Sequence, residues 1–131
     1  MTNSNYSMTA EGRWYRHESV AVNYADAIAS CTADGAYLAV ISDTAENDAV
    51  HGLDSGVDKW IGLDDLLVPG DHVWVNGSQS DFENWNDGEP SSEGPGGGED
   101  CVELRSQGDW NDLPCGQLEE FACECDPLYR P

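Results

Sequence analysis

Basic residues are the scarcest chemical class in this sequence. Its 131 residues include 26 acidic side chains but only five basic ones, Lys59 and four arginines, so the formal net charge is −21. Nucleic acids and anionic membranes both attract basic surfaces, so this balance argues against either as a partner. The acidity has two interpretations, a cation-binding site and an acidic surface that maintains solubility, and we expect both to contribute.

Long apolar runs are also missing. No stretch approaches the length of a transmembrane span, which predicts no membrane insertion. The polar residues 1–10 lack the apolar core of a signal peptide, so an exported protein would be a mature form or would leave by another route. The length suits one domain, which we place at residues 13–125, after a flexible lead-in at 1–12 and before a tail at 126–131.

The five cysteines contain no Cys-x-x-Cys pair and no His-bearing zinc spacing. Two disulfides with one cysteine left over is the natural count, which indicates an oxidising compartment and a secreted or extracellular protein. The three histidines, His17, His51 and His72, are scattered and are assigned no ligand role. No Ser-His-Asp or Cys-His arrangement stands out either.

Two helices and several short strands are predicted from the apolar pattern. Tyr24, Ala27, Ile28 and Cys31 recur at helical spacing before a stop at Asp34-Gly35. A second helix carries Ala45 to Leu53, with Ser42, Asp43 or Thr44 as its cap. We expect strands at 13–16, 36–41, 60–63, 73–75, 101–104 and 121–124, and we interpret 110–119 as a connection.

The segment from Trp85 to Asp112 carries the most informative chemistry. Only Arg105 opposes its eight acids, which are Asp87, Glu89, Glu93, Glu99, Asp100, Glu103, Asp109 and Asp112. Calcium takes about six to eight oxygen ligands, and such donors are available at Glu89, Glu99, Asn111 and Asp112. Magnesium demands tighter octahedral geometry, and zinc prefers His or thiolate ligands, so calcium is the predicted ion.

A solvated acidic surface is the simpler interpretation of such a charge run. Residues that anchor a loop to a core are interleaved with the acids, however, namely Trp85, Cys101, Trp110 and Cys115. We expect both tryptophans to be core residues. The loop is therefore expected to be held in place.

Five motifs occur in one order along the chain: Trp60-Ile61-Gly62-Leu63, Glu89-Pro90-Ser91, Gly98-Glu99-Asp100-Cys101, Trp110-Asn111-Asp112 and Phe121-Ala122-Cys123-Glu124. In these the chain resembles the C-type lectin-like domain family, from Trp14 to Glu124. The resemblance implies an α+β double-loop fold, with two helices flanking a small mixed sheet and a long calcium-binding loop. It also implies the disulfides Cys31–Cys123 and Cys101–Cys115. Cys125 is then free, bonded to Cys125 of a second chain in a homodimer, or bonded to another partner.

Carried over residue by residue, the resemblance gives a calcium and sugar site at Glu89, Ser91, Glu99, Asn111 and Asp112. It also implies a cis bond between Glu89 and Pro90. Ser91 departs from the family's asparagine and offers no amide donor. Glu89 in the first position favours mannose, glucose or fucose-type sugars over galactose.

A second, weak calcium site is implied at Asp65, Glu99 and Asp100. The resemblance leaves this site incomplete, because Pro69 and Ser92 fall where the family has acids. We therefore expect one firm calcium and at most a weak second one.

Three functions are open from the sequence. The first is a calcium-dependent carbohydrate-binding domain, and the second is a calcium-stabilised domain of the same fold that binds a protein or another non-sugar ligand. The third is a glycosidase that uses Glu89 and Glu99. We predict that the protein is not an enzyme, since carboxylates saturated by calcium cannot act as a tuned general acid.

Overall fold

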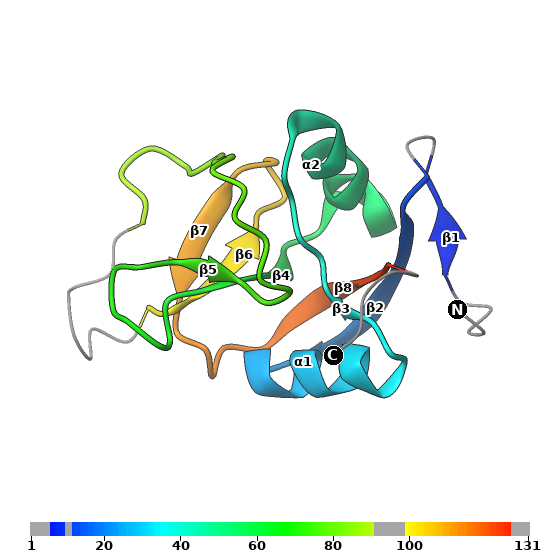
Figure 1. Cartoon of the computed structure of the whole chain (residues 1–131), viewed down its shortest axis with the longest axis horizontal. Helices are drawn as coiled ribbons and strands as arrows, with labels where there is room; N and C mark the ends of the chain where they lie inside the picture. The colour runs from blue at the N-terminus through cyan, green and yellow to red at the C-terminus, as the bar shows by residue number, and fades with distance from the viewer. Residues whose placement is uncertain (1–5, 10–11, 91–98, 127–131) are drawn as a thin grey trace.

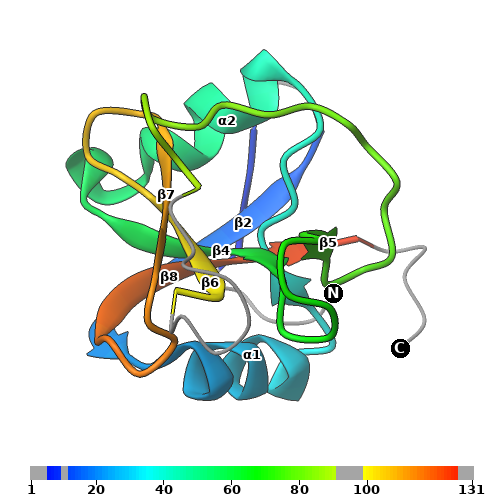
Figure 2. The ribbon, with the colours of Figure 1, turned by 90° about the vertical axis from the view of Figure 1, so that its left-hand side faces the viewer.

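The computed structural model describes residues 6–9, 12–90 and 99–126. Helix α1 (Tyr24–Ala33) and helix α2 (Thr44–His51) lie on opposite sides of a sheet of short strands (Figures 1 and 2). Residues 65–90, which follow β4, extend away from β1 to the far end of the molecule (Figure 1). This arrangement confirms the expected α+β class with two flanking helices and a mixed sheet.

Both helices begin at a side-chain cap. Asn23 caps α1 by accepting a hydrogen bond from the Asp26 N–H at 2.8 Å, and the buried face carries Tyr24, Ala27 and Cys31. Asp43 caps α2 in the same way through the Glu46 N–H. The second helix ends earlier than predicted, because Leu53 lies in a following 3-10 helix, η1 (Leu53–Gly56).

The strands form one mixed sheet. Its order is β1 (Ser7–Met8), β2 (Trp14–Val22), β8 (Glu119–Cys125), β4 (Lys59–Asp64), β6 (Cys101–Leu104) and β7 (Trp110–Leu113). In addition, β3 (Tyr37–Leu38) pairs with β8 and β5 (Val73–Trp74) pairs with β4. The β4–β8 pair is parallel and the other pairs are antiparallel.

Two expectations about strands were wrong. The predicted strand at 36–41 shortens to Tyr37–Leu38, because the Ala39 carbonyl accepts from the Gly62 N–H at 2.8 Å and the following residues pack into the core. A side chain at Gly62 would meet the Leu38 carbonyl oxygen at 2.6 Å, so this approach requires glycine. The interpretation of 110–119 as a connection missed strand β7, which pairs with β6.

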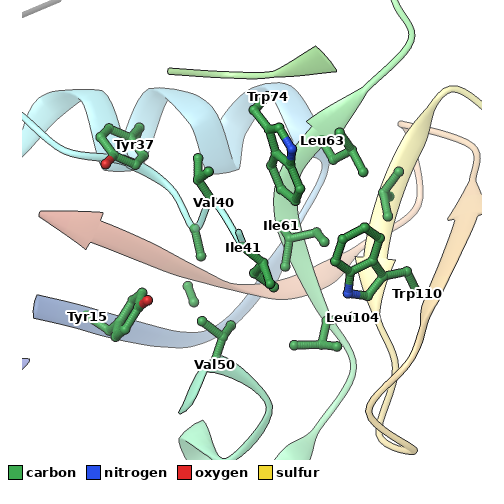
Figure 3. Close-up of a cluster of buried hydrophobic side chains, with 13 residues drawn as sticks. Tyr15, Tyr37, Val40, Ile41, Val50, Ile61, Leu63, Trp74, Leu104 and Trp110 are labelled. Atoms are coloured by element: carbon green, nitrogen blue, oxygen red, sulfur yellow. The ribbon is translucent and has the colours of Figure 1, made fainter. Parts of the chain in front are cut away.

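Two packed clusters hold the sheet. One joins Ile61, Leu104 and Val50 with the rings of Trp74 and Trp110 (Figure 3). The other surrounds the Cys31–Cys123 disulfide, and a second disulfide joins Cys101 to Cys115. Both disulfides are the expected ones.

Candidate functional site

The segment that leads to Glu89 is fastened to the first residue of β7. Trp85 forms an isolated bridge with Trp110. The Asn86 N–H donates to the Trp110 carbonyl at 2.9 Å, and the Trp110 N–H donates to the Asn84 carbonyl at 2.9 Å. Strand β7 therefore carries the Trp-Asn-Asp motif directly beside the residues that precede Glu89.

Glu99 and Asp100 immediately precede β6, whose first residue, Cys101, lies opposite Leu113 at the other end of β7 from Trp110. Within the β6–β7 ladder, Val102 lies opposite Asp112 and Glu103 lies opposite Asn111. The backbone thus brings together the three segments that carry Glu89, Glu99 and the Asn111-Asp112 pair. We call these four residues the loop ligands.

The loop ligands differ in burial. Asp112 is fully buried, whereas Glu89, Glu99 and Asn111 are partly exposed. The peptide bond between Glu89 and Pro90 is cis, as the resemblance implied. Ser91, the fifth predicted site residue, lies outside the described residues.

Asp65 and Asp100 form a second acidic pair beside Glu99. The Asp65 N–H donates to the Asp100 carbonyl at 2.9 Å. The Asp65 side chain is 1% exposed, and its Oδ2 accepts from the Gly70 N–H at 2.8 Å. Its other oxygen, Oδ1, is buried without a hydrogen-bond partner in the described part of the chain. Burial and the neighbouring Asp65 carboxyl raise the pKa of Asp100.

The donor set around these acids fits calcium. Carboxylate and amide oxygens are the ligands that this ion takes, and neither a thiol nor an imidazole is among the predicted ligands. A buried carboxylate oxygen without a partner is costly unless a cation or a donor reaches it, and Asp65 Oδ1 is such an atom. The residues present therefore suit a hard divalent cation, with the loop ligands as the primary set.

The loop region, residues 65–100, contains nine acidic residues and no lysine or arginine. Within the loop region, the basic group nearest to the Asp65–Asp100 pair is the ring of His72. Its Nε2 lies 4.0 Å from Asp65 Oδ2. Glu46 and Glu124, outside this region, bind Arg13 at 3.0 and 3.1 Å. The loop region therefore supplies no arginine or lysine to neutralise its own acids.

Asn111 has a partner that the sequence did not reveal. Its Nδ2 donates to Glu103 Oε2 at 3.0 Å, and Glu103 is 6% exposed. The contact depends on the β6–β7 register. It was missed because 110–119 was interpreted as a connection, and the sequence Trp-Asn-Asp-Leu has no apolar alternation that indicates a strand.

Glu103 belongs to a separate acidic group. Two groups of three His or carboxylate side chains have ligand atoms within 4.8 Å of one another in the described part of the chain. One contains Asp58, Glu103 and Glu119, and neither includes a loop ligand. Burial, Glu103 and Asp58 together raise the pKa of Glu119 to about 8.

Trp110 is a core residue, as predicted. It is 1% exposed, and its Nε1 donates to Asn47 Oδ1 at 2.8 Å. The rings of Trp74 and Trp85 each lie 5.6 Å from its ring in edge-on contact. A cavity of about 290 Å³ opens beside this ring cluster and is also lined by His72. Trp85 is only partly buried, and it packs against the core from the loop side.

Cys125 carries a free thiol. Its side chain is 2% exposed, and burial raises its pKa. Neither described helix is long and apolar enough to cross a membrane.

Comparisons with known proteins point in one direction. Residues 20–125 match the family described as the lectin C-type domain. Human collectin-10 is 37% identical over 106 residues, which cover 78% of this chain and 38% of that protein. The mouse low affinity immunoglobulin epsilon Fc receptor is 48% identical over 68 residues, covering 51% of this chain and 20% of the receptor. The chain thus spans between a fifth and two fifths of the length of these relatives.

Among solved structures, the cow CD23 C-type carbohydrate-recognition domain, crystallised in the presence of a GlcNAc2Man3 oligosaccharide, has a TM-score of 0.85. It is 28% identical to this chain, and the match covers 95% of both. The similarity therefore extends over the sheet, both helices and the described part of the loop region.

Proposed function

Since this chain belongs to the lectin C-type domain family, we propose that it is a calcium-dependent carbohydrate-binding domain for mannose, glucose or fucose-type sugars. The observation that supports the proposal is that all three segments lie along β7: the Glu89 segment is bonded to Trp110, Asn111 and Asp112 follow in β7, and Glu99 precedes the strand β6 that pairs with it. The likeness to a CD23 domain crystallised in the presence of a mannose-containing oligosaccharide supports the sugar class.

The loop ligands would hold the ion, with Ser91 as a fifth contributor. When bound, calcium supplies a centre at which two vicinal sugar hydroxyls replace water. The carboxylates of Glu89 and Glu99 then accept hydrogen bonds from those hydroxyls. They also orient the sugar, because each hydroxyl has one hydrogen to donate.

Asn111 has a defined orientation in this scheme. Its Nδ2 faces Glu103, so Oδ1 is the atom left for the cation. An amide nitrogen has two hydrogens, and the second can be donated to a sugar hydroxyl. Glu103 thus acts as a positioning residue for Asn111.

Asp65, Glu99 and Asp100 would form the weaker calcium site. The buried Asp65 Oδ1, which has no hydrogen-bond partner among the described residues, supports a cation there. A protein with this function and two disulfides would work in an oxidising, extracellular setting. We propose no catalytic role for its acids.

The alternative is a calcium-stabilised domain that binds a protein. One relative is named as an immunoglobulin epsilon Fc receptor, and Ser91 lacks the amide that the sugar mechanism uses. In this case calcium would order the loop region without contacting the ligand.

A glycan array probed with and without EDTA separates these functions, and it is run beside a calcium-dependent thermal melt. Signals on mannose- or fucose-terminated glycans that EDTA removes would support the sugar proposal. A calcium-dependent rise in melting temperature with a blank array would refute it in favour of a protein ligand. Asn111→Ala should abolish calcium and sugar binding together, and Ser91→Asn should strengthen mannose binding.

A further inference from the structure

We infer that Asp58, Glu103 and Glu119 form an additional calcium site, separate from the loop region. We call this group the sheet site. The three residues come from three neighbouring parts of the sheet: Asp58 immediately precedes β4, Glu103 lies in β6 and Glu119 begins β8. Their ligand atoms lie within 4.8 Å of one another.

The strand register explains why these carboxylates meet. Trp60 lies opposite both Glu103 and Phe121, so the three side chains share one face of the sheet. Asp58 and Glu119 each lie two residues before a member of that row, and residues two apart point to the same face. The sheet therefore holds three carboxylates side by side, an arrangement that like charges destabilise unless they are neutralised.

Glu103 provides the evidence for a ligand. It is 6% exposed, and its Oε2 accepts from Asn111 while its Oε1 is buried without a hydrogen-bond partner among the described residues. A buried carboxylate oxygen without a partner costs free energy that a bound cation would offset. The Asn111 contact also orients Glu103 from behind, as partners of metal ligands usually do.

The nearby basic side chains are occupied elsewhere. Arg105 binds Asp109 through two contacts, at 2.6 and 3.1 Å. The Lys59 ammonium donates to the Val57 carbonyl at 2.8 Å. None of the three carboxylates forms an ion pair with a basic side chain in the described part of the chain. The remaining neutralisers are a proton on Glu119, whose pKa is raised to about 8, and a cation from solution that displaces this proton.

Calcium fits this site better than other ions. All three donors are carboxylates, and calcium accepts these with water in a flexible geometry, whereas magnesium requires a near-ideal octahedron. Asp58 is exposed and Glu119 is partly exposed, so an ion can enter from solvent. One Asp58 oxygen accepts from the Ser106 N–H at 2.6 Å, which fixes the side chain and leaves the other oxygen for the ion.

The second compact group, formed by His17, Asp54 and Glu120, does not have the properties of a metal site. His17 Nε2 lies 2.7 Å from Glu120 Oε1 and 3.4 Å from Asp54 Oδ2. Its other nitrogen, Nδ1, is buried without a partner in the described residues. A metal-bound histidine normally donates its second N–H to an acceptor. These residues are therefore a hydrogen-bonded group, and Glu120 offers a matched control.

Isothermal titration calorimetry with calcium alone tests the sheet site. The proteins are the wild type, Glu119→Gln, Glu120→Gln and Glu99→Gln. Glu119→Gln should lose one binding event that the wild type shows, and Glu120→Gln, the adjacent β8 residue with the same charge change, should keep it. Glu99→Gln should lose the loop event and retain the sheet event, so failure of either site is recognised separately.

Thermal melts test whether a variant loses a calcium-binding event only because it is unfolded. In EDTA, Glu119→Gln should melt at or above the temperature of the wild type, because the amide removes repulsion from Asp58 and Glu103. Addition of calcium should raise the melting temperature of Glu119→Gln by less than it raises that of the wild type. The sheet site is refuted if Glu119→Gln binds calcium with unchanged stoichiometry and affinity, or if Glu99→Gln binds none.

Discussion

The loop region and the surroundings of Arg13 and Arg16 differ in how their carboxylates are neutralised. Outside residues 65–100, the buried Glu46 and Glu124 share Arg13, and Asp34 binds Arg16 at 3.0 Å. Inside the loop region there is no arginine or lysine for nine acids. The comparison teaches that arginines of the chain pair with Glu46, Glu124 and Asp34, whereas the loop region contains no arginine or lysine for its acids, and we propose that calcium neutralises some of them.

Trp110 contacts both the loop region and the core of the sheet. Its backbone holds Asn84 and Asn86, and its ring packs within the core cluster of the sheet (Figure 3). Trp110 is therefore one of the attachments of the loop region to the sheet, beside the pairing of β5 with β4 and the buried ring of Trp74. Removing its side chain should affect both regions at once.

The largest effect is expected from Trp110→Ala. Removing a fully buried tryptophan costs about 3–5 kcal/mol of unfolding free energy, and the Asn47 side chain also loses its donor. Calcium binding should weaken with it, because Asn111 and Asp112 follow directly. Urea unfolding and calcium titration of this variant measure both effects, and unchanged calcium affinity would show that the two regions are independent.

The next largest effect is the pH dependence of stability that comes from Glu124, which pairs with Arg13. Burial raises the pKa of Glu124 from an ordinary value of 4.5 to about 7. The folded state thus holds this proton more tightly than the unfolded state, so the stabilisation is complete below about pH 4.5 and is lost as the pH rises through 7. The full change amounts to roughly 3 kcal/mol.

Glu124→Gln measures this contribution, because glutamine resembles the protonated acid and keeps an acceptor for the Val40 N–H. The unfolding free energy of the variant relative to wild type should rise by up to that amount between pH 4.5 and pH 8. Parallel pH profiles for the two proteins would contradict the raised pKa.

A smaller loss is expected for Arg13→Met, which leaves Glu46 and Glu124 without their cation. Because the Arg13 side chain is 41% exposed, water replaces part of the interaction, and we expect a cost of about 2 kcal/mol. The calcium-dependent shift in melting temperature should stay the same. A reduced shift would mean that the two regions do not neutralise their charges separately.

The smallest effect is expected for Cys125→Ser, which should lower the unfolding free energy by about 1 kcal/mol or less. The thiol is buried at the end of β8, so a disulfide between two chains would require that strand end to open. We expect a monomer on a non-reducing gel for both wild type and variant. A wild-type dimer that the serine variant lacks would overturn this expectation.

The sequence predicted local features and motifs better than strand pairing. Apolar spacing located α1 and its buried Cys31, and the motifs implied both disulfides. Strand β7 was missed, since its pairing with β6 joins residues six to twelve positions apart, whose register no local pattern determines. The proposed sheet site was not predicted for a similar reason, because Asp58, Glu103 and Glu119 meet only through the pairing of β4 with β6 and β8.

The candidate site was also predicted only in part. The structure brings the segments of Glu89, Glu99 and Asn111-Asp112 together, whereas Ser91 lies outside the described residues. The Asn111–Glu103 contact was not foreseen, because Glu103 was counted only as one more acid of the segment. Calcium and the mannose, glucose or fucose-type sugars stay predictions, and the glycan array and the calcium-dependent melt test them.

The pairing of β2 with β8 has a practical consequence for attachment. It places Trp14 opposite Cys125, at the end of the molecule away from the loop region (Figure 1). Copies tethered to a bead or a scaffold at this side of the β2–β8 pair would therefore present their loop regions outward, all in the same sense. A monosaccharide contact of about −4 kcal/mol, or millimolar affinity, would then gain from effective concentration, provided that the spacing of the tethers matches that of the glycans.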